Sequence, residues 1–464
     1  MKISIYNFKS IGSLVNYEMR PLTILSGTNS SGKSSFLQLL LLLKQTIEID
    51  SAQTPLELRG RLIKIRKYID ILKGKNPANK LKIELLFNKS ELSKYKAFQE
   101  FSLYEAFEDY NLQIAVVFDF ISNKVIVSSF EITFKTDSIT NFIRFENNSE
   151  IFDIKTDVAV FNDDLYTKQG DYKIKKINFS AFIPSDFEIE FTDGSTTKSV
   201  PKLEGIKSVI KDVFSKLNYI GPLRQEPKDE YGVNGNESSV GIDGGNVAEV
   251  LCELSEKSIS YFTVEENDES INLVKKSETF INAVRYWLCE KLKLCADVYS
   301  KKEADSYVIY LKSFAGVEST IKHVGFGVSQ VLPILVEGLR LKEGETLILE
   351  QPEIHLHPKI QSKLSDFLIS LIQNGKKVVI ETHSDHLITR VRRRIAEDST
   401  NMLDNKVLLT FIEVSVKDVL FRNIDIDDLG NLDYFPEDFI EKPDVEFKSI
   451  LKAQMKKRLK QLEK

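Results

Sequence analysis

The sequence predicts an α/β fold with an antiparallel β subdomain and a helical insertion. A glycine- and serine-rich loop, residues 26–35, joins a short apolar run to a leucine-rich helical run that continues to Leu43. From residue 82 to about residue 193 the chain changes to short alternating apolar runs separated by Asn, Asp, Ser and Gly, which is typical of antiparallel strands. Two later apolar runs, residues 346–349 and 377–380, indicate buried strands that each end in a glutamate.

The loop carries the pattern G-x-x-x-x-G-K-[ST], completed by Gly27, Gly32, Lys33 and Ser34. Glycines allow the tight turn that points backbone N–H groups at phosphate oxygens, and the following helix presents its positive end to the same anion. We expect Lys33 to reach the β- and γ-phosphates of ATP and Ser34 to bind Mg²⁺. A Gly/Ser-rich turn with a chance lysine is the alternative, and the strand-to-helix context argues against it. The predicted nucleotide contacts in this loop are Gly27, Thr28, Asn29, Ser30, Ser31, Gly32, Lys33, Ser34 and Ser35.

Composition narrows the class of protein. The 464 residues are 42% hydrophobic and include 63 basic and 68 acidic residues, so the net charge of −5 gives no sign of nucleic-acid binding by the whole chain. Cys252, Cys289 and Cys295 follow no metal or disulfide pattern and indicate reduced thiols. The N-terminal residues lack the apolar stretch of a secretion signal, and no apolar run is long enough to cross a membrane. We therefore expect a soluble cytoplasmic protein.

Residues 1–200 are predicted to form the first part of the nucleotide-binding unit. Strands are expected at Met1–Phe8 and Tyr17–Arg20, with a turn at Lys9–Asn16 between them. A basic segment, Arg59–Lys75, follows the leucine-rich helix. A solvated face is the favoured interpretation of its cations, and contact with a nucleic-acid backbone is the alternative.

Residues 201–296 are predicted to form a mainly helical insertion. A long Gly/Asn-rich loop follows Tyr219 inside it, and a loop of this length is usually functional or mobile. Arg224 in that loop either points at the nucleotide or pairs with a neighbouring carboxylate. Strand character returns at Val298–Leu311, and residues 297–410 complete the nucleotide-binding unit. The expected helices are Lys207–Leu217, Val247–Tyr261 and Ser277–Leu294.

A second group of polar residues lies between residues 323 and 386. Glu350 ends a buried strand, where a carboxylate is unfavourable unless it pairs with a cation or orders water, so we expect it to hold Mg²⁺. His383 follows the next strand, at the position where α/β sheets gather their ligand residues. His355 and His357 lack a third ligand at suitable spacing, so a histidine metal site is disfavoured. A loop before an apolar helix is expected to approach a further phosphate through Gly325, Gly327, Ser329 and Gln330.

The order of the segments GTNSSGKSS, VGFGVSQ, LILEQPEIHLHP and VVIETHSDHL resembles the ABC-type ATPases of the SMC-like and OLD-like (overcoming lysogenization defect) group. The resemblance is strong over residues 1–45 and 320–395 and weaker over residues 218–250. It implies an ABC-type P-loop head. In such proteins ATP is sandwiched between two heads, with the phosphate loop of one facing the signature loop of the other.

The resemblance also implies roles for single residues. Lys33 and Ser34 correspond to the phosphate and Mg²⁺ ligands, Glu350 to the Walker B acid, and His383 to the switch histidine that senses the γ-phosphate. Gly327 and Ser329 correspond most closely to the signature residues that act on ATP bound by the partner head.

Three departures from the family pattern affect these roles. The signature is not LSGGQ, so the register of its serine is open, and the Walker B acid is Glu where Asp is usual. Gln351 stands where many ABC proteins carry the catalytic glutamate. Either Glu353 supplies the base instead, or Gln351 only orients water, which would make turnover slow.

Residues 411–464 form a C-terminal extension. Related proteins often continue into a TOPRIM-type nuclease, but Glu413 is not followed by the glycine of that motif, and Asp425 and Asp427 fit a surface turn, so no nuclease is expected. Phe447–Leu462 is predicted to form a basic amphipathic helix. Contact with protein is favoured over nucleic acid, because the acidic stretch Asp433–Glu446 lies beside it.

The sequence therefore predicts a compact Mg²⁺-dependent ATPase head without the long heptad run of a coiled coil. We expect a homo-oligomer built from head-to-tail dimers that controls a separately encoded effector, a nuclease or toxin. The resemblance implies a role in bacterial anti-phage defence. Two alternatives stay open: a DNA repair or maintenance ATPase of the RecF type, and a non-hydrolysing scaffold in which ATP only holds the oligomer together.

Overall fold

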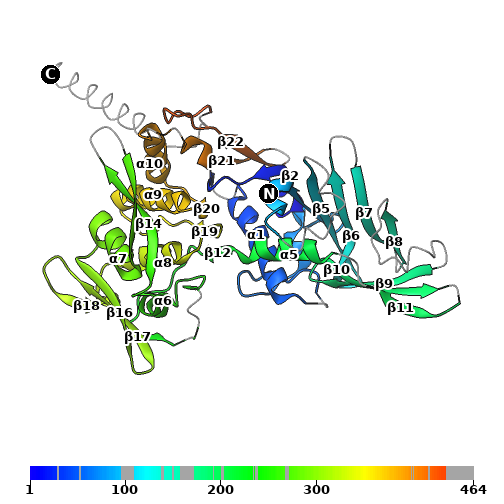
Figure 1. The fold of residues 1–464 in the computed structure, drawn as a ribbon, viewed down its shortest axis with the longest axis horizontal. Helices are drawn as coiled ribbons and strands as arrows, with labels where there is room; N and C mark the ends of the chain where they lie inside the picture. The colour runs from blue at the N-terminus through cyan, green and yellow to red at the C-terminus, as the bar shows by residue number, and fades with distance from the viewer. Residues whose placement is uncertain are drawn as a thin grey trace, which may run out of the picture.

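The computed structural model shows a mixed α/β protein built around a central, mostly parallel sheet (Figure 1). It describes residues 1–28, 31–51, 54–95, 109–136, 140–148, 151–156, 172–191, 193–199, 203–233, 235, 239–266, 271–398, 400, 402–415 and 418–434. An antiparallel β lobe lies at the right of Figure 1, and a lobe of helices and short strands lies at the left. The α/β fold with an antiparallel β subdomain is therefore confirmed.

Six strands form the central sheet, in the order β12, β19, β20, β3, β21 and β22. The first five are parallel, and β22 pairs antiparallel with β21 at one edge. Parallel strands end at the same edge of a sheet, so the residues that follow β3, β19 and β20 come together there. The strands cover Leu217–Ile220 (β12), Thr346–Glu350 (β19), Lys377–Glu381 (β20), Leu22–Gly27 (β3), Val407–Val414 (β21) and Val419–Ile424 (β22).

Helices cover both faces of the central sheet. On one face Ile348 and Val379 join the hydrophobic core of α1 and the antiparallel lobe. On the other face Leu347 and Ile380 join a second core, which includes α8, α9 and α10. Alternate residues of one strand thus enter different cores, which explains why these strands are continuous apolar runs in the sequence. The helices cover Lys33–Ile49 (α1), Phe326–Arg340 (α8), Pro358–Gln373 (α9) and Asp385–Ala396 (α10).

The antiparallel lobe contains two sheets. Seven strands pair in the order β2, β1, β4, β5, β6, β7 and β8, and three more pair in the order β11, β10 and β9. The antiparallel region predicted between residues 82 and 193 is thus confirmed. The strands cover Lys2–Phe8 (β1), Ile11–Glu18 (β2), Leu81–Asn88 (β4), Asn111–Ile121 (β5), Lys124–Lys135 (β6), Thr140–Asn148 (β7), Ile151–Thr156 (β8), Tyr172–Ser180 (β9), Ile183–Phe191 (β10) and Thr196–Ser199 (β11).

The predicted turn at Lys9–Asn16 is wrong, because β2 already begins at Ile11. Ile3 faces Tyr17 and Ile5 faces Leu14, so β2 advances three residues where β1 advances two. This bulge breaks the alternation of buried and exposed side chains that marks a strand in a sequence.

Residues 201–296 contain strands as well as helices. The predicted helices are wrong at Ser258–Tyr261 and at Ser277–Thr279, which belong to a β-hairpin. Leu251, Leu254 and Tyr261 are spaced by three and seven residues, so the apolar spacing of this segment also fits one face of a helix. Pairing with the second strand, which the local pattern does not reveal, decides the structure. The elements here are α5 (Glu204–Ser215), α6 (Val247–Glu253), β14 (Ser258–Glu266), β15 (Ile271–Thr279), α7 (Phe280–Arg285) and the π-helix η4 (Tyr286–Lys291).

A small sheet of four strands completes the left-hand lobe of Figure 1. Val298–Leu311, expected to have strand character, spans two strands of this sheet that are joined by a turn. The strands cover Tyr231–Gly232 (β13), Asp297–Glu303 (β16), Ser306–Lys312 (β17) and Glu318–Thr320 (β18). The domain boundaries near residues 200, 296 and 410 stay predictions.

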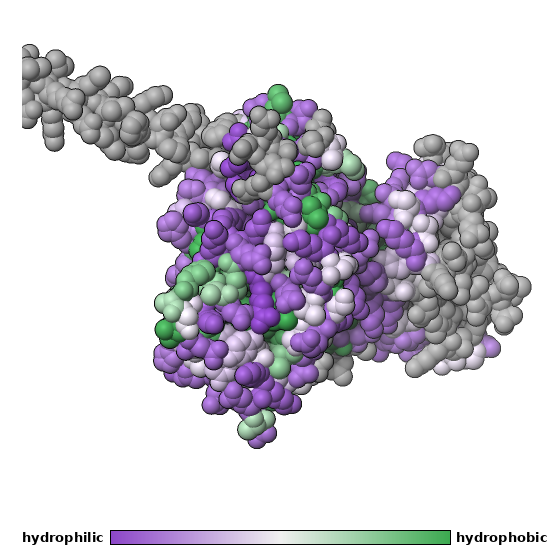
Figure 2. Space-filling view, turned by 60° about the vertical axis from the view of Figure 1, so that its left-hand side comes forward, coloured by the Kyte–Doolittle hydropathy of each residue, from purple (hydrophilic) through white to green (hydrophobic). Residues whose placement is uncertain are grey.

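The surface and the C-terminal region bear on the remaining expectations. Hydrophilic residues predominate on the face shown in Figure 2, and hydrophobic residues gather there only in small groups. Within the described ranges, no helix has the length and apolarity needed to cross a bilayer. Asp427 accepts hydrogen bonds from the N–H groups of Leu429 and Asn431, as expected for a surface turn. The predicted helix Phe447–Leu462 lies outside the described residues.

Candidate functional site

The phosphate loop joins β3 to α1 and requires glycine at two positions. Gly27 has a φ of 144°, and a Cβ added there would lie 2.1 Å from the carbonyl oxygen of Ile412. Gly32 has a φ of 101°, and its added Cβ would lie 2.3 Å from Oγ of Ser10. L side chains rarely adopt these conformations, so only glycine lets the backbone follow this path. Two predicted nucleotide contacts of the loop, Asn29 and Ser30, lie outside the described residues.

Lys33 folds back over the phosphate loop. Its Nζ donates hydrogen bonds to the carbonyl oxygens of Gly27, at 2.9 Å, and Thr28, at 2.6 Å. Burial lowers the pKa of Lys33, and the nearby Glu381 carboxylate opposes this shift. The cation therefore lies at the N-terminal end of α1, where backbone N–H groups also favour an anion.

The serines of the loop have different partners. Ser34 Oγ donates to Glu381 Oε1 at 2.9 Å, and Ser35 Oγ forms a hydrogen bond with Ser10 Oγ at 3.2 Å. Ser31 Oγ is buried without a partner in the described part of the chain. The predicted Mg²⁺ ligand Ser34 thus lies against Glu381, a carboxylate that is not among the predicted site residues.

Glu350 and Glu381 end neighbouring parallel strands and stand in the same register position. Burial, together with repulsion from Glu381, raises the pKa of Glu350 to about 7. Burial also raises the pKa of Glu381, while the Ser34 hydroxyl and Lys33 oppose that shift. A sequence signal for Glu381 existed, because it ends a buried strand just as Glu350 does.

Tyr219 and Arg224 come from the loop side of β12 and lie against Glu350. The Tyr219 hydroxyl donates a hydrogen bond to the Glu350 carboxylate. Arg224 is 7% exposed, and its Nη2 donates to the Glu350 carbonyl oxygen at 3.4 Å. Burial lowers the pKa of Arg224 to about 10, an effect that Glu353 opposes. Among the described residues Arg224 forms no ion pair with a carboxylate, and its Nε and Nη1 have no hydrogen-bond partner, so both interpretations of Arg224 stay predictions.

Gln351 and Glu353, the two residues predicted to act on the attacking water, follow β19. Gln351 has a φ of 45°, and its N–H donates to the Glu381 carbonyl oxygen at 2.7 Å. Glu353 Oε1 accepts a hydrogen bond from the His383 N–H at 2.7 Å, and burial raises the pKa of Glu353. Burial and Lys33 lower the pKa of His383, which favours its neutral form. These contacts connect the segments after β19 and β20. Whether Glu353 supplies the base or Gln351 only orients the water stays a prediction.

The predicted signature loop is wrong in one respect, because α8 begins at Phe326 and places Gly327, Ser329 and Gln330 inside the helix. Ser329 and Gln330 are buried, and Ser329 Oγ donates to the Phe326 carbonyl oxygen at 2.8 Å. Gly325 caps the helix and is exposed, with no atom within 4 Å of an added Cβ. Helix α8 thus begins earlier in the chain than its glycine residues suggest.

The two histidines after β19 have separate structural roles. The His355 ring packs edge-on against the Phe326 ring, with 5.1 Å between the centroids. His357 caps α9, where its Nδ1 accepts a hydrogen bond from the Lys359 N–H at 3.3 Å. His355 therefore brings the segment after Glu350 against the exposed N-terminus of α8.

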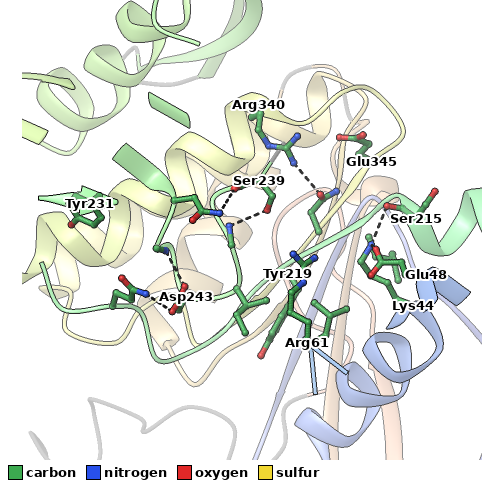
Figure 3. A pocket seen from close by; sticks show the side chains of 18 of the residues that line it. Lys44, Glu48, Arg61, Ser215, Tyr219, Tyr231, Ser239, Asp243, Arg340 and Glu345 are labelled. Atoms are coloured by element: carbon green, nitrogen blue, oxygen red, sulfur yellow. Dashed lines mark hydrogen bonds and ion pairs between the residues drawn. The ribbon is translucent and has the colours of Figure 1, made fainter. Parts of the chain in front are cut away.

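A polar cavity of about 710 Å³ opens beside β12 (Figure 3). Its walls come from α1, the loop after β12 and the end of α8, and Figure 3 shows Arg61 beside Tyr219. Lys44 and Arg340 already form ion pairs, with Glu48 and Glu337 respectively. Tyr219 thus lines the cavity and also bonds to the predicted Mg²⁺ ligand Glu350.

Comparison with known proteins gives both structural and sequence matches. The structure "SmcHead bound to the C-winged helix domain of ScpA" is 10% identical, covers 92% of this chain and 98% of its own, and gives a TM-score of 0.40. The SMC head domain from Thermotoga maritima is 9% identical, covers 91% of this chain and 97% of its own, and gives a TM-score of 0.35. A third structure is a Smc head domain with an extended coiled coil, bound to the C-terminal domain of ScpA derived from Pyrococcus furiosus. It is 9% identical, the match covers 91% of this chain and 96% of its own, and the TM-score is 0.38.

No curated protein matches this chain in sequence. A family model described as AAA ATPase domain matches residues 1–388. That range contains the phosphate loop and the segments after β19 and β20, and membership of such a family implies nucleotide binding. Since the match spans most of the chain and every strand of the parallel sheet except β21, this chain belongs to the AAA ATPase domain family.

Proposed function

We propose that this protein is a Mg²⁺-dependent ATPase whose two heads enclose ATP between them, and that this assembly controls a separately encoded effector. The observation that carries the ATPase proposal is the meeting of Lys33, Ser34 and Glu350 at one edge of the parallel sheet. A lysine over a phosphate loop, a hydroxyl at the start of the next helix and a buried carboxylate are the groups that a triphosphate and its cation require.

Each residue has a defined task in this proposal. Lys33 exchanges its carbonyl partners for the β- and γ-phosphate oxygens, while the N–H groups at the start of α1 bind the same anion. Ser34 and Glu350 would hold Mg²⁺, which neutralises charge on the phosphates when bound. Glu353 accepts a proton from the attacking water, or Gln351 orients that water, and His383 senses the γ-phosphate beside them.

The proposal for a head-to-tail dimer rests on α8. Its N-terminus is exposed at Gly325 and Phe326, and in the described residues no hydrogen bond or ion pair joins it to the phosphate loop of its own chain. A helix of 15 residues with a free N-terminus attracts an anion. We place the γ-phosphate of ATP bound by the second copy there, which makes each site incomplete without its partner.

Replacing Gly325 with aspartate should prevent ATP-dependent dimerisation without impairing folding. Gly325 has extended backbone angles and open space around it, and aspartate is a preferred N-cap residue, so the helix should form at least as well. The new carboxylate would repel the γ-phosphate of the partner. We expect unchanged ATP binding to the monomer, loss of the dimer in light scattering, and hydrolysis lowered about 10- to 100-fold.

Gly325→Asn is the matched control, since asparagine has the same shape and cap preference but no charge. It should dimerise far better than the aspartate variant. Equal dimerisation and hydrolysis in both variants and in the wild type would contradict the role given to α8.

Control of an effector in bacterial anti-phage defence is the biological setting we propose. It is supported by the resemblance of the VVIETHSDHL and LILEQPEIHLHP segments to compact OLD-like ATPases, which is an argument from analogy. An assembly that appears only with ATP, and that binds the product of a neighbouring gene, would support it. Loss of phage resistance in the Gly325→Asp variant would be its test in cells.

A second candidate, a RecF-type DNA ATPase, is favoured by one exposed basic loop after α1. Five cations lie in nine residues, all are exposed, and none forms an ion pair with a described residue. Gln45 of α1 holds this loop through hydrogen bonds with Glu57, Leu62 and Ile63, so the charges stand on a fixed backbone. The five cations are Arg59, Arg61, Lys64, Arg66 and Lys67.

If this loop binds duplex DNA, changing Arg59, Lys64 and Lys67 to glutamine should weaken binding and lower its salt dependence. Each lost phosphate contact should reduce the slope of log affinity against log salt by about 0.9. Fluorescence anisotropy with a labelled duplex at several salt concentrations measures both effects. A variant with three exposed cations of the other lobe changed to glutamine, Lys275, Lys301 and Lys302, is the control, and equal losses in the two variants would exclude a specific loop contact.

A further inference from the structure

Glu350 and Glu381 form a pair of buried carboxylates at the edge of the central sheet. Parallel pairing of β19 and β20 sets Glu350 directly beside Glu381, and the two are 9% and 4% exposed. Ser34 Oγ donates to Glu381 Oε1 at 2.9 Å, and the Tyr219 hydroxyl donates to Glu350. The predicted Mg²⁺ ligand of α1 is thus in direct contact with the carboxylate of β20.

The charges of this pair are not balanced within the described part of the chain. Neither Glu350 nor Glu381 forms an ion pair there, and Oε2 of Glu381 has no hydrogen-bond partner. Two lysines act on the pair without forming an ion pair with it, Lys33 on Glu381 and Lys9 on Glu350. Lys33 Nζ already binds the carbonyl oxygens of Gly27 and Thr28, and Lys9 Nζ donates to Oε1 of Gln38. Two adjacent buried carboxylates are unfavourable unless a cation joins them.

A purely structural role for Glu381 would need only one hydrogen-bond acceptor for Ser34. A neutral glutamine in the same place would supply that acceptor and would remove the repulsion with Glu350. Retaining a second ionisable group at this cost in stability indicates a positively charged ligand.

The donor atoms identify the class of cation. Hydroxyl and carboxylate oxygens are hard ligands that suit Mg²⁺ and Mn²⁺ rather than softer metals. The described residues include no group of three or more His, Cys, Asp or Glu side chains that could hold a metal ion. Protein donors are therefore too few for a permanent site, and the remaining ligands must come from water and from phosphate oxygens at the adjacent loop.

We propose that Glu381 is a second carboxylate of the magnesium site and acts with Ser34 and Glu350 on the cation that arrives with ATP. This inference rests on the proposed ATPase function and adds a residue from the strand that precedes the switch histidine. Glu381 thereby links the cation to the segment of His383, because Glu381 is the last residue of β20 and His383 follows two residues later.

The test compares wild type with Glu381→Gln in nucleotide binding and in thermal unfolding. With EDTA present, affinity for ATP should be unchanged or higher, because a negative charge near the phosphates is gone. With ATP and increasing Mn²⁺, the free Mn²⁺ needed for half-saturation, measured by electron paramagnetic resonance, should rise about 10- to 100-fold. The unfolding temperature of the nucleotide-free variant should rise, and its increase on adding Mg²⁺ and ATP should shrink.

Glu337→Gln is the matched control, since Glu337 is another buried glutamate but pairs with Arg340 of its own helix instead of contacting Ser34. It should leave the Mn²⁺ requirement unchanged. An unchanged Mn²⁺ requirement in Glu381→Gln, or lower stability together with weaker binding in EDTA, would overturn the inference and leave Glu381 a structural partner of Ser34. Failure of the wild type to bind ATP with or without metal would instead overturn the proposed function itself.

Discussion

Lys33→Ala should lower ATP affinity about 100-fold or more and reduce hydrolysis to background. Lys33 is the cation held over the phosphate loop, and its ammonium already lies on the carbonyl oxygens of Gly27 and Thr28. Alanine removes the charge that would bind the β- and γ-phosphates and leaves those phosphates without a partner in a partly buried site. Isothermal titration with ATP and a phosphate-release assay measure the two effects.

Lys44→Ala is the matched control for Lys33→Ala. Lys44 is a second buried lysine of α1, but it pairs with Glu48 and donates to the carbonyl oxygens of Phe214 and Ser215. Its loss should lower the unfolding temperature while ATP affinity stays near the wild-type value. Hydrolysis that persists in Lys33→Ala, at unchanged nucleotide affinity, would refute the central claim that the loop binds the triphosphate.

Glu350→Gln should abolish Mg²⁺-dependent hydrolysis and trap an ATP-bound species larger than the monomer. Glutamine keeps the acceptor for the Tyr219 hydroxyl but no longer offers a charged oxygen to the cation. ATP should then bind without being turned over, so the sandwiched dimer accumulates. Light scattering with ATP, beside a phosphate-release assay, measures assembly and turnover in the same sample.

The same variant should change the pH dependence of stability. The pKa of Glu350 is about 7 in the folded protein, against an ordinary value of 4.5. The folded state therefore binds more protons than the unfolded state between these values, and the free energy of unfolding falls as pH rises through that window. Glu350→Gln removes this loss, so its stability advantage over wild type without nucleotide should grow with pH to roughly 3 kcal/mol above pH 7.

Denaturant unfolding at pH 5 and pH 8 checks this sign. A stability difference between the proteins that shrinks toward pH 8 would contradict the assigned environment of Glu350.

Assembly by the wild type with ATP but without any phosphate release would favour the alternative of a non-hydrolysing scaffold.

Local sequence signals predict most of the candidate site. The spacing of Gly27, Gly32, Lys33 and Ser34 sufficed for the phosphate loop, because the chemistry of a tight turn over an anion permits few residue types. Glu350 stands out in the sequence because a buried carboxylate at the end of an apolar strand is unfavourable unless a cation or ordered water compensates its charge. Glu381 carries the same signal, because it also ends a buried apolar strand.

The predicted elements are wrong where the apolar spacing does not distinguish the 3.6-residue period of a helix from the two-residue period of a strand. Leu254 and Tyr261, seven residues apart, fit one face of a helix until β14 pairs with β15. The bulge between β1 and β2 breaks the alternation of buried and exposed side chains that marks a strand. The start of α8 was displaced because glycine at residue 327 suggested a loop, although a helix tolerates one glycine in its first turn.

The sequence by itself predicted the buried strands β3, β19 and β20, the phosphate loop and the ionisable groups at the strand ends, since each depends on residues close together in the chain. Only the tertiary structure decided which groups meet. Ser34 contacts Glu381 across 347 positions, and Arg224 reaches the Glu350 carbonyl oxygen across 126, because strand order places β3, β20, β19 and β12 side by side. Strand order follows from the packing of two cores on opposite faces of one sheet, and no local pattern encodes it.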